Sequence, residues 1–172
     1  MLEPDRIRIV GATEGDLAAV AALAQAVWRK HYPGIITPEQ IEYMLARGYA
    51  RAALRRFLTE AGAGLELAHV DGRFAGFAAY HRGEGSDELK LDKLYVDQHF
   101  HSQGVGRRLI EATEAAAHAQ RRTTIILNVN KNNTQAIRAY ERNGFVVREA
   151  VVVDIGAGFV MDDYIMAKRL PR

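Results

Sequence analysis

The stretch HFHSQGVGRRLIEATEAAAHAQ, residues 99–120, runs from a glycine-rich turn directly into a helical pattern. Two glycines, Gly104 and Gly106, stand one residue apart at its start. Apolar residues then recur at intervals of four, three and four, which places them on one helical face: Val105, Leu109, Ala112 and Ala116. Glycines at a helix start leave backbone N–H groups uncovered, and these groups attract anions together with the helix dipole. The stretch therefore predicts an anion-binding loop at a helix N-terminus.

The composition is that of an ordinary globular chain. Its 172 residues suffice for one domain with a substantial core, and 48% are hydrophobic. A net charge of +2 gives no indication of a nucleic-acid or membrane partner, and the absence of cysteine excludes thiolate catalysis and cysteine-based zinc sites. The N-terminal sequence MLEPDRIRIV lacks the apolar core of a signal peptide. We therefore expect one domain spanning residues 1–172, located in the cytoplasm.

The hydrophobic patterns on both sides of the glycine-rich stretch predict an α+β fold. Before it we expect a strand at 7–10, helices at about 17–30, 37–48 and 50–62, and strands at 65–70, 73–80 and 88–96. After it we expect a buried parallel strand at 124–129, a helix at 133–143, and one or two strands at 145–155 and 163–170. This order predicts a mixed, mostly antiparallel central sheet with flanking helices.

Two other phosphate-binding loops are excluded by the residues. A P-loop consists of a glycine, four intervening residues and then Gly-Lys-Ser/Thr, and the chain has no such sequence. A dinucleotide fingerprint requires a further glycine three residues after Gly106, where Leu109 stands instead. That fingerprint also lies in a βαβ unit, whereas antiparallel strands are predicted before this loop.

Two motifs in residues 88–146 together point to a known family. LYVDQHFHSQGVGRRLI, residues 94–110, contains a Q/R-x-x-G-x-G/A-like motif after a strand, at 101–106. NTQAIRAYERNGF, residues 133–145, matches the pattern Asn-x-x-Ala-x-x-x-Tyr-x-x-x-Gly-Phe. Both resemble the coenzyme-A-binding motifs of the GNAT superfamily of N-acetyltransferases, in the same order and at the same separation. His101 departs from the family's Gln or Arg, and we expect this change to modify coenzyme A affinity rather than abolish it.

The resemblance implies the GNAT fold and acetyl-CoA as cosubstrate, with no metal. Backbone N–H groups from Ser102 to Arg107 would hold the pyrophosphate, and the arginines that open the helix either meet a phosphate or are solvated. In the family the pantetheine arm pairs with a strand that splays from its parallel neighbour. The residues expected to contact coenzyme A are Leu94, Tyr95, Val96, His101, Ser102, Gln103, Gly104, Val105, Gly106, Arg107, Arg108, Asn133, Ala136 and Tyr140.

The resemblance also implies catalytic roles for three residues. The Val96 amide would stabilise the oxyanion that develops on the thioester carbonyl. Tyr140 would protonate the leaving thiolate, although a tyrosine on an amphipathic helix is also an ordinary core residue. Asp92 is the preferred general base and Glu88 its alternative, with desolvation expected to raise the pKa of such a carboxylate. A solvated strand charge that pairs with neighbouring lysines is the competing interpretation of Asp92. A β-bulge, common in this strand of the family, would obscure which residue faces inward.

The acceptor site is expected where the family binds its variable substrate. Trp28 and Tyr32 lie in the N-terminal helical region, and Asp162 and Asp163 follow the turn GAGF. Two adjacent acids suit a cationic amine, and the stretches WRKHYPGIITPEQIEYML and GFVMDDYIM are weakly similar to bacterial diamine and polyamine acetyltransferases. The predicted function is acetyl transfer to a primary amine of a small molecule by direct attack in a ternary complex. A protein or peptide acetyltransferase and a non-catalytic acyl-CoA-binding module are the alternatives.

Three further patterns carry weaker predictions. His99 and His101 form an H-x-H pair but have no third ligand nearby in sequence, so we expect no metal site. Arginines at 47, 51 and 55 recur along one helical face, which is typical of a solvated surface. The apolar run Ala150–Ile155 suits pairing of C-terminal strands in a homodimer, as in many relatives.

Overall fold

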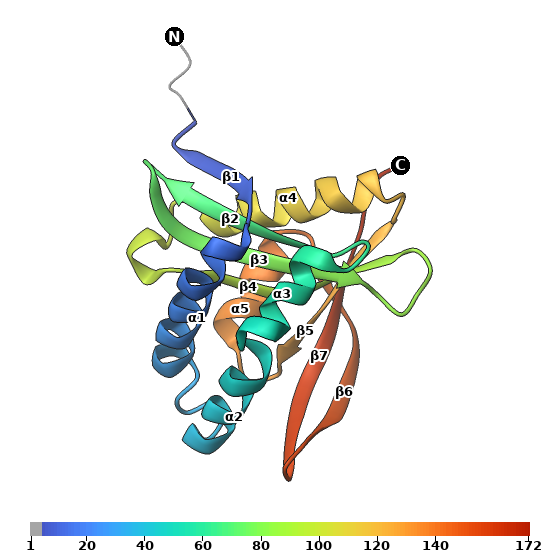
Figure 1. Cartoon of the computed structure of the whole chain (residues 1–172). Coiled ribbons are helices and arrows are strands. Elements are labelled where there is room, and N and C mark those ends of the chain that lie inside the picture. Colours follow the sequence, from blue (N-terminus) through green and yellow to red (C-terminus); the bar gives the residue numbers. More distant parts are fainter. Residues whose placement is uncertain (1–4) are drawn as a thin grey trace.

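The computed structural model describes residues 5–172 and confirms the predicted order of elements (Figure 1). The strands are β1 (Ile7–Gly11), β2 (Gly64–Val70), β3 (Arg73–Arg82), β4 (Glu88–Val96), β5 (Thr124–Asn130), β6 (Val146–Gly156) and β7 (Phe159–Arg169). The helices are α1 (Leu17–His31), α2 (Pro38–Gly48), α3 (Arg51–Thr59), α4 (Val105–Ala119) and α5 (Thr134–Arg142). Short 3-10 turns lie at Glu14–Asp16 and Gln98–Phe100.

One mixed sheet organises the chain, in the order β1-β2-β3-β4-β5-β7-β6. Every neighbouring pair is antiparallel except β4 and β5, which are parallel. The sheet is therefore mixed and mostly antiparallel, as predicted.

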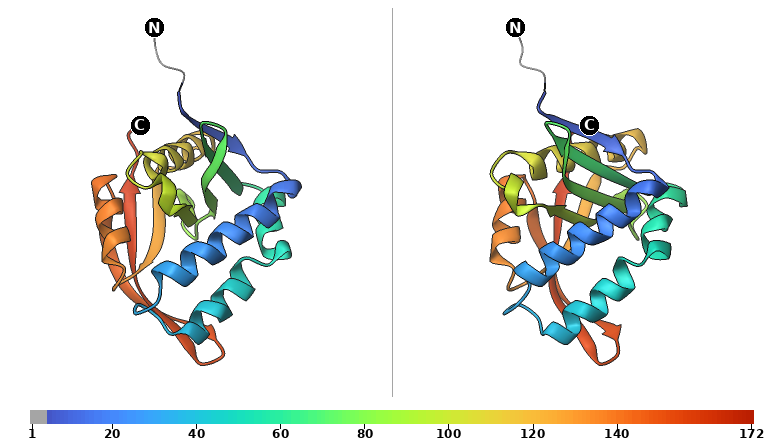
Figure 2. Two further views of the ribbon diagram at one scale, coloured as in Figure 1. Left: turned by 90° about the vertical axis from the view of Figure 1, so that its left-hand side faces the viewer. Right: turned by 60° about the vertical axis from the view of Figure 1, so that its left-hand side comes forward.

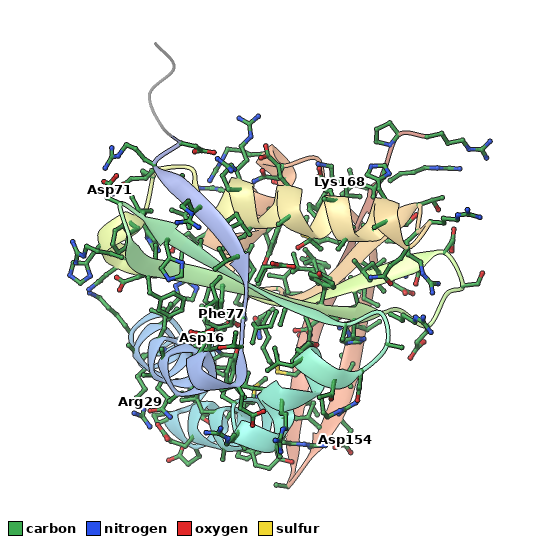
Figure 3. All side chains as sticks on the ribbon, turned by 45° about the horizontal axis from the view of Figure 1, so that its top comes forward. Asp16, Arg29, Asp71, Phe77, Asp154 and Lys168 are labelled. Atoms are coloured by element: carbon green, nitrogen blue, oxygen red, sulfur yellow. The ribbon has the colours of Figure 1, made fainter. Side chains whose placement is uncertain are left out.

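The two faces of the sheet are covered by different helices, and each has its own apolar cluster (Figure 2). Leu17 of α1, Leu45 of α2 and Leu54 of α3 pack with Phe77 of β3 on one face. Leu109 of α4 packs with strand residues on the other, where α5 contributes partly buried side chains. Figure 3 places Phe77 inside the molecule, with charged side chains at its periphery. The sheet therefore lies between two helical layers.

The parallel strands β4 and β5 stay together over only part of their length. Residues Glu88–Lys90 of β4 pair with Thr124–Ile126 of β5, and no pairing follows further along. The β3–β4 register shifts at the same point, because Tyr80 pairs with Leu91 while the preceding Ala79 pairs with Lys93. Asp92 is thus the extra residue of a β-bulge, which bends and twists its strand. The bulge and the splay expected from the GNAT resemblance are both present.

The C-terminal hairpin β6–β7 closes one end of the sheet and differs in one respect from the prediction. Ala157 and Gly158 both have positive φ, 53° and 81°, as a two-residue hairpin turn of type I′ requires. Strand β7 begins at Phe159 rather than at residue 163, so Asp162 as well as Asp163 lies within the strand. Successive strand residues point to opposite faces, and the two acids are therefore separated.

Candidate active site

A groove of about 360 Å³ runs from the N-terminus of α4 to α5. Gly104 is the residue that caps α4, with φ of 86°, and no side chain caps the helix there. The first N–H groups of a helix have no partner within it, so they are directed at whatever occupies the groove. Ser102, Gly104, Gly106 and Arg107 line this end. The predicted anion-binding loop is therefore an open helix N-terminus.

The splayed end of β4 lines the same groove. Most residues expected to contact coenzyme A meet here, from the loop, β4 and α5: Leu94, Tyr95, Val96, His101, Ser102, Gly104, Val105, Gly106, Arg107, Asn133, Ala136 and Tyr140. Two others lie outside its lining. Gln103 donates to the His99 carbonyl over 3.3 Å, and Arg108 pairs with Asp5 and Glu111. Of the two arginines, Arg107 is therefore the one at the groove.

The direction of the Val96 amide follows from the β3–β4 ladder. The Asp97 amide donates to the Ala75 carbonyl at 2.8 Å, and the preceding residue, Val96, pairs with Gly76. Hydrogen-bonded and non-hydrogen-bonded positions alternate in an antiparallel pair, so Val96 occupies a non-hydrogen-bonded position. Its N–H and C=O therefore point away from β3, into the opening between β4 and β5. This backbone N–H is therefore not used by the β3–β4 ladder, and its role as oxyanion donor stays a prediction.

His101 holds the loop to this strand. Its Nε2 lies 3.0 Å from the Val96 carbonyl oxygen, and a carbonyl only accepts, so the ring nitrogen donates. The carbonyl that would otherwise face the opening is thereby occupied, while the Val96 amide stays free of this bond. The residue that departs from the family motif thus joins the end of β4 to the glycine-rich loop before α4.

Asn133 joins α5 to α1 at the floor of the groove. Its Oδ1 accepts from the Ala136 amide at 3.3 Å, which caps α5, and lies 2.9 Å from His31 Nε2. Asn133 is buried, with 5% of its surface exposed. Sequence reasoning missed His31, because nothing in the local pattern of α1 indicates a partner 102 residues away.

Tyr140 presents a hydroxyl without a protein partner. Within residues 5–172 no group hydrogen-bonds to this hydroxyl, while its ring lies 5.6 Å from that of Phe145. Burial, with the neighbouring Tyr32 as a smaller cause, raises the pKa of Tyr140 above the ordinary tyrosine value. The phenol is therefore neutral at physiological pH and has a proton to donate into the opening.

A second cavity, of about 350 Å³, lies on the other side of the splayed strands. It shares Tyr32, Tyr95 and Tyr140 with the groove, so the two spaces meet at these hydroxyl-bearing side chains. Trp28 and Tyr49 complete an aromatic wall, in which the Trp28 ring stacks on Tyr32 with centroids 4.2 Å apart. Trp28 and Tyr32 thus reach the predicted acceptor site. Tyr49, another aromatic residue of the N-terminal helical region, also lines it.

Asp163 and Asp162 have different surroundings, as strand alternation requires. Asp163 lines the second cavity and is 3% exposed. Asp162 forms an ion pair with Lys131 and does not line this cavity. Only one of the two predicted acceptor acids therefore faces the site.

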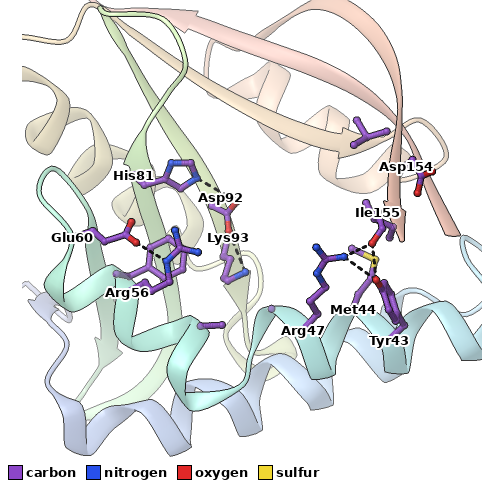
Figure 4. A pocket seen from close by; sticks show the side chains of 14 residues that line it. Tyr43, Met44, Arg47, Arg56, Glu60, His81, Asp92, Lys93, Asp154 and Ile155 are labelled. Atoms are coloured by element: carbon purple, nitrogen blue, oxygen red, sulfur yellow. Dashed lines mark hydrogen bonds and ion pairs between the residues drawn. The ribbon is translucent and has the colours of Figure 1, made fainter. Parts of the chain in front are cut away.

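An outer cavity of about 540 Å³ adjoins the second one and contains Asp92 (Figure 4). Asp92 lies 3.1 Å from Lys93 Nζ and 3.7 Å from His81 Nε2. Burial opposes ionisation of Asp92, but His81 and Lys93 outweigh it, and the pKa of the carboxyl is lowered. The expectation that desolvation raises the pKa of Asp92 is wrong, because two cationic partners surround it. Glu88, the alternative base, pairs with Arg148 and lines none of these three cavities.

The weaker sequence patterns have ordinary structural surroundings. Arg51 and Arg55 both pair with Glu14, and Arg47 bonds to the Ile155 carbonyl. Among the described residues no cluster of three or more metal-ligating side chains is present. In the same part of the chain no helix is long and apolar enough to cross a membrane.

Comparison with known proteins agrees with this geometry. A family profile described as an acetyltransferase (GNAT) domain matches residues 35–163. The chain belongs to the GNAT acetyltransferases. An uncharacterized N-acetyltransferase of Mycobacterium tuberculosis is 28% identical over 155 residues, which cover 90% of this chain and 98% of that one. Spermine/spermidine N(1)-acetyltransferase of Bacillus subtilis is 30% identical over 84 residues, covering 45% of this chain and 55% of that one.

The GNAT fold is also found in solved structures. The PaiA N-acetyltransferase of Thermoplasma acidophilum, crystallised in complex with coenzyme A, superposes with a TM-score of 0.79 at 23% identity. The match covers 95% of this chain and 98% of that one. This GNAT member is therefore an N-acetyltransferase, and the fold built on its seven-stranded mixed sheet superposes on the PaiA structure.

Proposed function

We propose that this GNAT enzyme transfers an acetyl group from acetyl-CoA to a primary amine of a small molecule. The observation that carries the proposal is the opening between β4 and β5, where the donor groove meets the aromatic cavity at Tyr140. The groove fits coenzyme A, because it combines an open helix N-terminus for phosphates with the unpaired backbone of β4 for the pantetheine amides. Bound there, acetyl-CoA supplies the thioester that the amine attacks.

Two groups of the chain serve the chemical step. The Val96 amide stabilises charge on the carbonyl oxygen, a contribution typically worth about 2.7–4 kcal/mol of barrier. The Tyr140 hydroxyl gives its proton to the departing sulfur, since its raised pKa keeps it protonated and no described residue competes for that proton. Because the amine attacks the thioester directly, the reaction needs no covalent enzyme intermediate.

The acceptor cavity favours a small cationic amine over a protein substrate. The β6–β7 hairpin is fastened over α2 by the bond from the Tyr43 hydroxyl to the Ile155 carbonyl, 2.6 Å, and by that from Gln40 Nε2 to the Val160 carbonyl, 2.8 Å. Val153, Ile155 and Met161 of this hairpin line the acceptor cavity, which restricts the room for an extended peptide. Aromatic walls with one buried carboxylate suit an ammonium group, and the Bacillus subtilis relative is named for polyamines.

Titration calorimetry followed by an acceptor panel tests the proposal. We expect the purified protein to bind acetyl-CoA and coenzyme A but neither ATP nor NADH. Spermidine, a short diamine and a lysine-bearing peptide are then compared for release of free coenzyme A thiol. Turnover of the peptide alone would favour the protein acetyltransferase, and binding without turnover of any amine would favour the acyl-CoA-binding module.

Self-association is a separate prediction. Exposed valines gather on the C-terminal hairpin, with Val152 65% exposed and Val146 64% exposed. Pairing of two copies through this strand stays a prediction, and a monomeric mass by light scattering at micromolar concentration would contradict it.

A further inference from the structure

One carboxylate oxygen in the acceptor cavity has no partner. Asp163 Oδ1 is fully buried and, within residues 5–172, forms no hydrogen bond. Asp163 Oδ2 has only a long contact, 3.5 Å, with Asn128 Nδ2. Burying a carboxylate without partners is costly, so nearly all such groups in proteins are paired or functional. The Asp163 carboxylate therefore has acceptor capacity that no described group of the protein uses, and the side chain lines the acceptor cavity.

The other acids near the site lack this freedom. Asp92 is held by Lys93 and His81, and Glu88 by Arg148. Asp162 is 57% exposed at its side chain and bound to Lys131. Among the described acids that line the second cavity, Asp92 and Asp163, only Asp163 has an unengaged oxygen.

We propose that Asp163 is the general base, which receives the acceptor amine as an ammonium ion and takes one proton from it. This inference rests on the proposed function and assigns the base to β7 rather than to the bulged strand β4. Asp163 and Tyr140 line the same cavity, and Asp163 Oδ1 has no hydrogen-bond partner among the described residues.

The proton balance of the step closes without any further reactant. The ammonium gives one proton to Asp163, and the neutral nitrogen attacks the thioester carbonyl carbon. As the C–S bond breaks, the sulfur takes the Tyr140 proton, and the new amide nitrogen returns its second proton to the Tyr140 oxygen. Asp163 then releases its proton to water when the product leaves.

The charges around Asp163 are consistent with this role. Burial raises its pKa, while the hydrogen bond from Asn128 and the charge of Lys90 lower it; Asp162 raises it slightly and Lys131 lowers it slightly. The net result is a pKa above the ordinary aspartate value, which makes the carboxylate a better base than a solvated one. An acid with a raised pKa in the folded state costs stability when it ionises at neutral pH. Asp163 is thus a group whose removal is expected to preserve or raise the unfolding temperature.

The test compares wild type, Asp163→Asn and the matched control Asp162→Asn, which removes the neighbouring charge on the opposite face. Spermidine is the acceptor, and kcat/KM is measured against pH. We expect Asp163→Asn to lose about 10²–10³-fold near pH 7, because a lysine-like amine is roughly 10³-fold more protonated than free there. The remaining kcat/KM of Asp163→Asn should rise tenfold per pH unit up to the pKa of the amine. The kcat/KM of wild type should stop rising at a lower pH. Asp162→Asn should stay within about twofold of wild type.

Two controls separate a base from a structural residue. Acetyl-CoA affinity of Asp163→Asn should stay within about twofold and its unfolding temperature should not fall. With 2,2,2-trifluoroethylamine as acceptor, which is largely unprotonated at neutral pH, the difference in kcat/KM between wild type and Asp163→Asn should be smaller. A wild-type pH profile in Asp163→Asn, weaker acetyl-CoA binding or a lower unfolding temperature would each overturn the assignment. Wild-type protein that acetylates no amine would instead refute the proposed function itself.

Discussion

Replacing Tyr140 by phenylalanine tests the central chemical step with little structural disturbance. The hydroxyl has no hydrogen-bond partner within residues 5–172, and the ring contact with Phe145 is retained in the variant. No internal hydrogen bond is lost, so the free energy of unfolding should change by less than about 0.5 kcal/mol. Acetyl-CoA affinity should stay within about twofold, because the groove's backbone donors are unchanged.

The effect of Tyr140→Phe should therefore fall on kcat. General acid catalysis typically contributes 10²–10⁴-fold, which corresponds to about 2.7–5.5 kcal/mol of barrier. Steady-state release of coenzyme A thiol, measured with saturating spermidine, gives kcat directly. Because burial raises the pKa of Tyr140, the wild-type rate should persist into alkaline pH beyond the ordinary tyrosine pKa of about 10. A kcat within threefold of wild type would remove Tyr140 from the mechanism.

Three further substitutions test the groove and the outer cavity. Val96→Pro removes an amide that the β3–β4 ladder does not use, so we expect kcat to fall about 10²–10³-fold. The control Val96→Ala keeps the amide and should retain most of the activity. Equal losses of kcat in the two variants would count against a role for the amide. Arg107→Ala should raise the KM for acetyl-CoA several-fold, because Arg107 lines the groove. Arg108→Ala should not, because Arg108 lies outside the groove lining, although both arginines pair with Glu111. The reverse order would contradict the phosphate assignment. The lowered pKa of Asp92 contributes stability that is complete above its unfolded pKa of about 3.9 and is lost as pH falls through the folded value. Acid unfolding of Asp92→Asn should consequently depend less on pH than that of wild type, and an unchanged pH dependence would show that Asp92 is not held by its neighbours.

Local sequence patterns were sufficient to predict the helices and strands and most of the residues that line the groove. Apolar periodicity predicted the helices and strands in order, because each amphipathic segment had to bury one face against the same sheet. The glycine-rich turn predicted the open N-terminus of α4, since the absence of side chains at Gly104 and Gly106 is a property of the sequence itself. Phosphate binding there stays a prediction. The residues that line the acceptor cavity were harder to predict from the sequence, for a physical reason. Its residues come from α1, β4 and β7, and no local spacing relates one element's side chains to another's.

The sequence by itself determined the fold class and the family, because these depend on short-range periodicity and on residues adjacent in the chain. Only the tertiary structure decided which acid is available to the acceptor. Asp92, Asp162 and Asp163 are chemically alike in sequence, but packing places cations beside the first two and leaves one oxygen of the third unpaired. The free energy of ionising a carboxylate depends on its burial and on nearby charges. Those surroundings are set by strands that meet only after folding.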